Sequence, residues 1–211
     1  MTWLRSVGAL VFCLAMMPAS AASILIFGDS ISAAYGMNIE QGWVSLLSQR
    51  LEVRYPGQHK VINASVSGET TSGGVRRLPA LLKQHEPDIV VIELGGNDGL
   101  RGQPPAMMER HLASMIRQSR QAGARVILLG MQIPPNYGKA YTQAFAAVFP
   151  RVGKAEGAAV LPFFLEGIGG VSALMQKDGI HPNAKAQPKL LELAWPLISD
   201  TLKVQKARKL N

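Results

Sequence analysis

Cysteine is almost absent from the sequence, since Cys13 is the only one among 211 residues. A lone cysteine cannot close a disulfide within the chain, and it cannot supply the clustered ligands of a structural zinc site. Nothing in the chain is low in complexity or repeated at a fixed period. The length suits one ordinary globular core, so we expect a single domain that is stable without disulfides.

Aromatic residues are also few, at 6% of the chain, although the formal net charge is +8. Nucleic-acid-binding surfaces combine basic and aromatic residues on one face. Here the basic residues are scattered or gathered in the C-terminal tail (Lys203, Lys206, Arg208, Lys209). We therefore expect no nucleic-acid partner. The tail is interpreted as a solvated end, with weak attraction to anionic membrane surfaces as the lesser alternative.

Long hydrophobic runs are missing beyond the first residues. Residues 7–17 are apolar, Arg5 precedes them, and Ala19-Ser20-Ala21 matches a small-x-small cleavage site. This pattern predicts a secretory signal over residues 1–21, followed by one mature domain of residues 22–211. The apolar run is short for a bilayer span, so a retained anchor is the weaker alternative. Cys13 would leave with the signal. We expect a periplasmic protein without stable membrane insertion.

Short apolar runs alternate with helical patterns along the mature chain. The runs predict strands at residues 23–27, 60–64, 88–94, 125–131 and 159–162. Between them, helices are predicted near 43–53, 72–84, 105–122 and 141–156, and a last helix from Pro188, kinked at Pro196. Apolar strands separated by helices indicate a parallel sheet covered on both faces. The predicted fold class is α/β, a flavodoxin-like three-layer α/β/α sandwich with a five-stranded parallel sheet.

Three segments that could carry chemistry each follow one of the first three strands. Ser30 lies in GDSIS, Gly68 in SGETT and Asn97 in GGNDG. In open parallel sheets, ligands bind beyond the carboxyl ends of the strands, where the strand order reverses. With the strand order 2-1-3-4-5, Ser30 and Asn97 would flank that point.

A serine at this edge becomes a nucleophile only if a base and an orienting group accompany it. His59, His85 and His111 fall in a loop or in helices away from the carboxyl edge, which favours solvated or packing roles. His181 lies in DGIHPN, three residues after Asp178, so one tight turn could bring the carboxylate to the imidazole. Taken alone, this segment fits an ordinary turn equally well.

Gly68 and Asn97 are candidates for binding a developing oxyanion, through a backbone N–H and a side-chain amide. A glycine-rich turn is the alternative for GGNDG. The segment lacks the spaced carboxylates of a calcium loop, and the chain has no phosphate-binding glycine loop. GDSIS departs from the nucleophile elbow G-x-S-x-G at Ser32. Asp29 and Glu69 are interpreted as turn residues or hydrogen-bond partners of the site.

Together, these segments resemble the four sequence blocks of the SGNH, or GDSL-type, serine hydrolases. The blocks are GDSIS, NASVSGET, ELGGNDGLRG and DGIHPN, and their order matches over nearly the whole mature chain. Longer stretches such as LPALLKQHEPD and DGIHPNAKAQP look closest to the periplasmic TesA-type branch. Its members are described as acyl-CoA thioesterase I, protease I, lysophospholipase or arylesterase.

The resemblance implies a Ser-His-Asp triad, in which Ser30 attacks the acyl carbonyl, His181 takes its proton and Asp178 orients His181. It also implies an oxyanion hole formed by the N–H groups of Ser30 and Gly68 and the side chain of Asn97. The expected activity is the hydrolysis of small acyl esters and thioesters, including aryl esters and lysophospholipids. No metal and no cofactor are expected.

Two alternatives stay open. The same triad could deacetylate sugars or peptidoglycan, or a periplasmic binding module could use the same crevice without covalent chemistry. The loop at residues 131–138, after the fourth strand, either walls an acyl pocket or forms a rigid proline-bearing connection.

Overall fold

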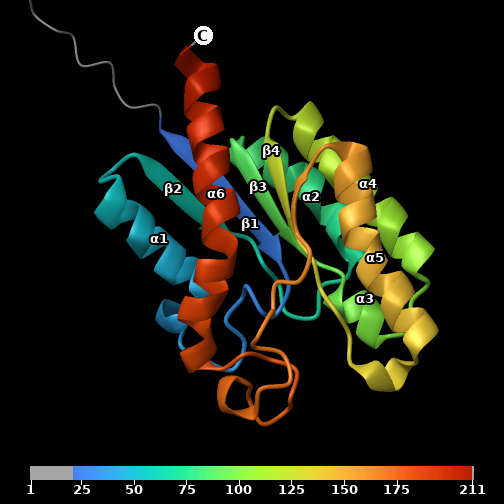
Figure 1. The fold of residues 1–211 in the computed structure, drawn as a ribbon. Helices are drawn as coiled ribbons and strands as arrows, with labels where there is room; N and C mark the ends of the chain where they lie inside the picture. Colours follow the sequence, from blue (N-terminus) through green and yellow to red (C-terminus); the bar gives the residue numbers. More distant parts are fainter. Residues whose placement is uncertain (1–20, 211) are drawn as a thin grey trace, which may run out of the picture.

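The structure is a computed structural model that describes residues 21–210. The predicted signal sequence, residues 1–21, lies outside this range except for its last residue. Figure 1 shows one sheet between two layers of helices.

The sheet has five strands, all parallel, in the order β2-β1-β3-β4-β5. Their bounds are β1 (Ala22–Gly28), β2 (His59–Asn63), β3 (Ile89–Glu93), β4 (Arg125–Leu129) and β5 (Ala159–Leu161). Every residue of β3 is buried, as expected for a central strand covered on both faces. The predicted fold class and strand order are confirmed.

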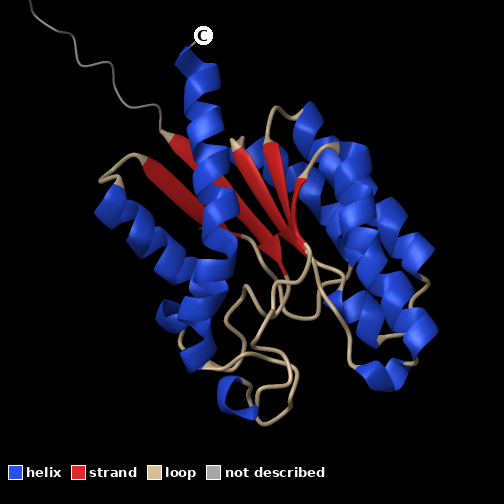
Figure 2. Ribbon diagram, viewed as in Figure 1, coloured by secondary structure: helices blue, strands red, loops and turns tan. Residues whose placement is uncertain are grey.

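Helices cover both faces of the sheet. α1 (Trp43–Arg54) packs beside α6 (Gln187–Leu210), while α2 (Thr71–His85), α4 (Pro105–Gln121) and α5 (Lys139–Glu156) form the other layer. Figure 2 shows the strands between these layers, with long loops at the carboxyl ends of the strands. Within residues 21–210, no helix combines the length and the apolar character needed to cross a bilayer.

Side-chain hydrogen bonds satisfy free N–H groups at the starts of two helices. Thr70 Oγ1 accepts a hydrogen bond from Gly73 N at 3.2 Å, which satisfies a free N–H in the first turn of α2. Gln187 is buried at the start of α6 and accepts a hydrogen bond from Trp43 N at 3.0 Å. It thereby caps α1 across the helix pair. α6 begins one residue before the predicted Pro188 and continues through Pro196, where the sequence predicts a kink.

The sequence did not predict the short helix α3 (Gly96–Leu100), because two of its five residues are glycines and glycine disfavours helix interiors. Packing explains its formation. A Cβ on Gly99 would lie 2.6 Å from both Ile133 Cγ2 and Phe145 Cε2, so only glycine allows this close approach. Four short 3-10 segments were also unpredicted: Ile39–Gln41, Pro135–Tyr137, Ser172–Leu174 and Ala184–Ala186.

Candidate active site

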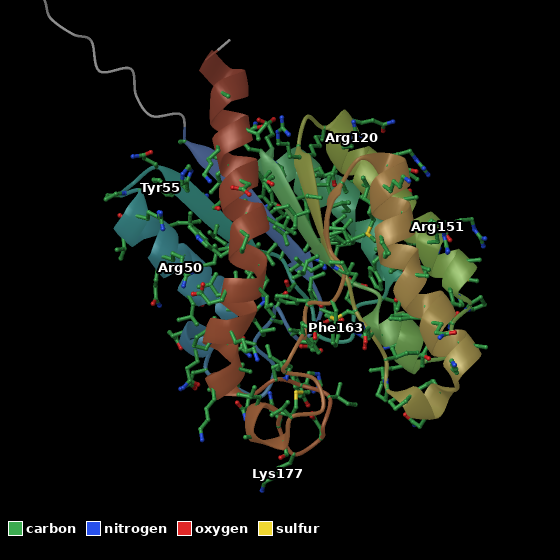
Figure 3. All side chains as sticks on the ribbon, viewed as in Figure 1. Arg50, Tyr55, Arg120, Arg151, Phe163 and Lys177 are labelled. Carbon is green, nitrogen blue, oxygen red and sulfur yellow. The ribbon has the colours of Figure 1, made fainter. Side chains whose placement is uncertain are left out.

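The loops beyond the carboxyl ends of the strands bring the five predicted site residues to one edge of the sheet. Ser30 lies two residues after β1, Gly68 follows β2 and Asn97 lies in α3 after β3. Asp178 and His181 come from the loop before α6. Figure 3 labels Lys177, which marks this loop at the end of the molecule where the strands finish.

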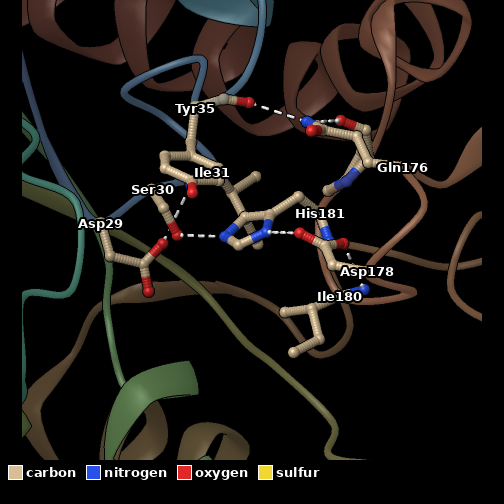
Figure 4. Close-up of polar contacts among 9 residues, drawn as sticks. Asp29, Ser30, Ile31, Tyr35, Gln176, Asp178, Ile180 and His181 are labelled. Atoms are coloured by element: carbon tan, nitrogen blue, oxygen red, sulfur yellow. Dashed lines mark hydrogen bonds and ion pairs between the residues drawn. The ribbon is translucent and has the colours of Figure 1, made fainter.

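Ser30, His181 and Asp178 form a continuous chain of hydrogen bonds (Figure 4). Ser30 Oγ lies 2.9 Å from His181 Nε2, and His181 Nδ1 lies 2.6 Å from Asp178 Oδ2. In neutral imidazole one nitrogen carries the proton, and a carboxylate can only accept. Asp178 therefore places the proton on Nδ1 and leaves Nε2 free to accept the proton of Ser30.

Residues 178–181, which we call the base turn, hold the carboxylate on a short stretch of backbone. Asp178 Oδ1 accepts hydrogen bonds from Ile180 N at 2.9 Å and His181 N at 3.0 Å. The pKa of Asp178 falls from 3.8 to about 2, chiefly because of the side-chain hydrogen bond from His181 and also because of these backbone donors. The carboxylate is thus ionised at neutral pH and directed at the imidazole by its own turn.

Tyr35 and Gln176 brace the base turn against the loop that follows Ser30. The ring of Tyr35 lies 4.6 Å, centroid to centroid, from the ring of His181. Gln176 Nε2 donates to Tyr35 O at 2.7 Å, and Gln176 N donates to His181 O at 2.7 Å. Residues from opposite ends of the chain are therefore tied together at the imidazole.

The three predicted oxyanion donors lie on the adjacent loops. Within the described chain, the N–H groups of Ser30 and Gly68 donate no hydrogen bond to another protein group. Gly68 has φ +77°, which favours glycine, and it is exposed. Asn97 Nδ2 donates one hydrogen to Asp29 Oδ2 at 3.0 Å, which leaves its second hydrogen available.

Sequence reasoning treated Asp29 only as a turn or hydrogen-bond residue, but it is a buried part of the site. Its side chain is 2% exposed, and it accepts from Asn97 and from Ile31 N at 3.1 Å. Burial raises the pKa of Asp29 to about 6, against the lowering effect of the hydrogen bond from Ile31. Asp29 thereby fixes the orientation of the Asn97 amide. Glu69, in contrast, forms an ion pair with Arg77 at 2.9 Å.

A second buried contact ties the segment of Gly68 to that of Asn97. Asp98 accepts from Thr71 N at 2.8 Å and from Thr71 Oγ1 at 2.6 Å, so α3 is joined to the first residue of α2. His111 Nδ1 lies 3.0 Å from Thr71 Oγ1. Since the single hydroxyl hydrogen goes to Asp98, His111 Nδ1 must be the donor in that contact.

The remaining histidines lie outside the site. His59 packs edge-on against Tyr55, and His85 ends α2. In residues 21–210, no three His, Cys, Asp or Glu side chains are grouped to hold a metal ion.

The loop at residues 131–138 packs on α3 rather than standing free. Met131 and Ile133 are buried, and Tyr137 Oη donates to Leu100 O at 2.9 Å. A cavity of about 730 Å³ lies elsewhere, between α1 and α6, and is lined by none of the site residues.

The family model described as "GDSL-like Lipase/Acylhydrolase family" matches residues 26–187. The chain belongs to the GDSL-like lipase/acylhydrolase family. The predicted family, and with it the class of enzymes that hydrolyse ester bonds, is confirmed.

Individual members of the GDSL-like family are similar over most of their length. "Esterase TesA" of Pseudomonas aeruginosa is 53% identical over 196 residues, which cover 92% of this chain and 96% of that protein. "Thioesterase 1/protease 1/lysophospholipase L1" of Escherichia coli K12 is 44% identical over 170 residues, which cover 81% and 80%. A crystal structure of the psychrotrophic esterase EstA from Pseudoalteromonas sp., inhibited by monoethylphosphonate, is also similar. The two sequences are 44% identical, and the superposition covers 86% of this chain and 99% of the EstA chain with a TM-score of 0.82.

Proposed function

We propose that this protein is an exported serine esterase that hydrolyses carboxylic esters and thioesters through an acyl-enzyme on Ser30. The observation that carries the proposal is the 2.9 Å contact between Ser30 Oγ and His181 Nε2, with Asp178 on the other imidazole nitrogen. Aryl esters, acyl thioesters and lysophospholipids are the proposed substrates, because these are the classes that the names of similar family members indicate. Export rests on the signal-like pattern of residues 1–21.

The reaction begins with attack of Ser30 Oγ on the acyl carbonyl, while His181 Nε2 takes the hydroxyl proton. Asp178 stabilises the imidazolium that forms. The negative charge that develops on the carbonyl oxygen is bound by the N–H groups of Ser30 and Gly68 and by the free amide hydrogen of Asn97. His181 then protonates the leaving alcohol or thiol.

Hydrolysis of the acyl-enzyme repeats these steps with water. His181 takes a proton from water while the water oxygen attacks the acyl carbonyl. His181 then returns this proton to Ser30 Oγ, which leaves as the hydroxyl. Ser30 and His181 are only partly buried, and Gly68 and Asp178 are exposed, so the site is open to solvent. An open site can admit water and leaving groups of different size.

The decisive experiment compares Ser30→Ala with Ser199→Ala, which removes a hydroxyl whose hydrogen bond, to Pro196 O at 3.2 Å, stays within α6. The mature protein is assayed with p-nitrophenyl esters, acyl-CoAs and lysophospholipids, and a fluorophosphonate probe tests for a reactive serine. We expect Ser30→Ala to lose turnover and labelling with its fold intact, and Ser199→Ala to keep both. Normal hydrolysis by Ser30→Ala would refute the mechanism. Labelling without turnover of any ester in the panel would refute the proposed substrates.

A further inference from the structure

A buried carboxyl contacts the turn that carries the nucleophile, although it is not one of the groups proposed to react. Glu93 is the last residue of β3, and its side chain is fully buried. In the parallel register it lies opposite Gly28, the last residue of β1. The carboxyl therefore sits where the chain leaves the sheet toward Ser30.

Glu93 contacts residues on both sides of Ser30. Its Oε2 accepts a hydrogen bond from Ser32 Oγ at 2.7 Å and a longer one from Asp29 N at 3.4 Å. Ser32 Oγ in turn accepts from Trp43 Nε1 at 3.2 Å. We call residues 29–32 the nucleophile turn. One carboxyl oxygen thus links this turn to β3 and, through Ser32, to α1.

The close approach of Glu93 to the nucleophile turn depends on Gly28, its partner on β1. A Cβ on Gly28 would lie 2.7 Å from Glu93 Oε2 and 2.8 Å from Ser32 Cβ. The absence of a side chain at this position lets the carboxyl reach under β1 to the nucleophile turn. Asn63 Nδ2 holds the far end of the same turn through Ser32 O, at 2.8 Å.

Glu93 is best described as a neutral acid. Burial raises its pKa well above the usual 4.5, and the nearby charge of Asp29 raises it further. Its second oxygen, Oε1, is buried without a hydrogen-bond partner, and no ion pair within residues 21–210 involves Glu93. An ionised carboxylate with one unsatisfied oxygen would be very costly there, whereas a protonated carboxyl is much less so.

We propose that Glu93 is a positioning residue of the nucleophile turn, which fixes where Ser30 presents its hydroxyl and its N–H without touching substrate. The inference rests on the proposed function, because it assumes that Ser30 is the reacting group. A small displacement of a reacting group is expensive: about 1 Å can cost roughly a hundredfold in rate. A neutral carboxyl holds the turn through hydrogen bonds and adds no negative charge beside Asp29.

The test uses Glu93→Gln and Glu93→Met, which have similar volume but differ in hydrogen bonding. Glutamine keeps an acceptor oxygen for Ser32 and Asp29, so we expect kcat within about threefold of wild type. Methionine removes the acceptor, so we expect kcat to fall by about 10- to 100-fold with KM nearly unchanged. The rate of fluorophosphonate labelling should fall in parallel. Infrared difference spectra should show a protonated carboxyl in wild type at pH 8 that Glu93→Gln lacks.

Val90→Ala is the matched control, because it damages the core of the same strand without contacting the nucleophile turn. It should lower stability and leave kcat unchanged. If Glu93→Met does not fold, Ser32→Ala decides, since it removes the hydroxyl through which Glu93 and Trp43 hold the nucleophile turn and should lower kcat about fivefold or more.

Three results would overturn the proposal. The first is an unchanged kcat in Glu93→Met or, where that variant does not fold, in Ser32→Ala. The second is an equal loss of kcat in Glu93→Gln and Glu93→Met, and the third is a comparable loss of kcat in Val90→Ala. Failure of the proposed function would look different, because wild type itself would then lack serine labelling or would turn over no ester of the panel.

Discussion

Replacing Asp178 by asparagine tests how the imidazole is oriented. The two backbone donors, Ile180 N and His181 N, hold the Oδ1 position at 2.9 and 3.0 Å and therefore demand an oxygen there. The amide nitrogen of the introduced asparagine must then face His181 Nδ1. It donates a hydrogen where the carboxylate accepted one, so the imidazole proton moves to Nε2 and can no longer leave that nitrogen free for Ser30.

The expected loss of kcat has two sources, the lost negative charge of Asp178 and the wrong tautomer of His181. The pKa of Asp178 falls from 3.8 to about 2, which corresponds to about 2.4 kcal/mol before solvent screening. The side chain is 38% exposed, so screening leaves about 1 kcal/mol, or less than tenfold in rate. The wrong tautomer costs more, and we expect kcat of Asp178→Asn to fall by about 10³- to 10⁴-fold.

The assay is kcat and KM for a p-nitrophenyl ester at pH 8, together with thermal unfolding. Asp178→Ala should lose less activity than Asp178→Asn, because alanine removes the charge but does not impose the wrong tautomer. Asp200→Asn is the matched control, because Asp200 also contacts a side chain three residues later, Lys203 Nζ at 2.8 Å, on the exposed face of α6. A kcat for Asp178→Asn within about tenfold of wild type would refute the tautomer argument.

Three further perturbations have defined outcomes. Asn97→Ala should lower kcat by about 10²- to 10³-fold with little change in KM, and an unchanged rate would remove Asn97 from oxyanion binding. The melting temperature of Asp29→Asn should rise relative to that of wild type between pH 4 and pH 8, although asparagine replaces one of the two accepting oxygens by a donor. The raised pKa of Asp29, about 6, means that its stabilising contribution is complete below pH 4 and is lost as the pH rises through 6; a melting-temperature difference that does not change with pH would contradict this. Gly68→Ala has open space around the new Cβ, whose nearest neighbour is Arg101 Nη2 at 3.9 Å. The φ of +77° should nevertheless cost about 1 kcal/mol in unfolding free energy and lower kcat by shifting the backbone N–H, and retention of both would contradict the strain expected at this φ.

The features that the sequence predicted are those fixed by local pattern. A continuous apolar run defines β3 within a residue or two at each end, because a strand buried on both faces needs no polar alternation. The spacing of Asp178 and His181 allowed their contact, since three residues suffice for a carboxylate to reach the imidazole across one turn, but the resemblance to the family was needed to choose it over an ordinary turn.

The features that it missed depend on contacts between distant segments. Glu93 could be noticed only as a charged residue in an otherwise apolar run, and nothing in the run shows that Ser32 and Trp43 meet it. Helix α3 opposes the helix propensity of its glycines and forms because Gly99 packs under Phe145, a residue of α5. Such compensation belongs to tertiary structure and leaves no local signal.

The base turn has a consequence for how activity can be lost. His181 and Asp178 share one four-residue turn, whereas Ser30 stands on a separate loop, and the two loops meet through Ser30, Tyr35 and Gln176. Opening that junction would withdraw the imidazole and its carboxylate from Ser30 together. His181 therefore does not face Ser30 without Asp178 beside it. Loosening of this loop should lower the fraction of molecules that are competent for catalysis and leave the turnover rate of each competent molecule unaltered.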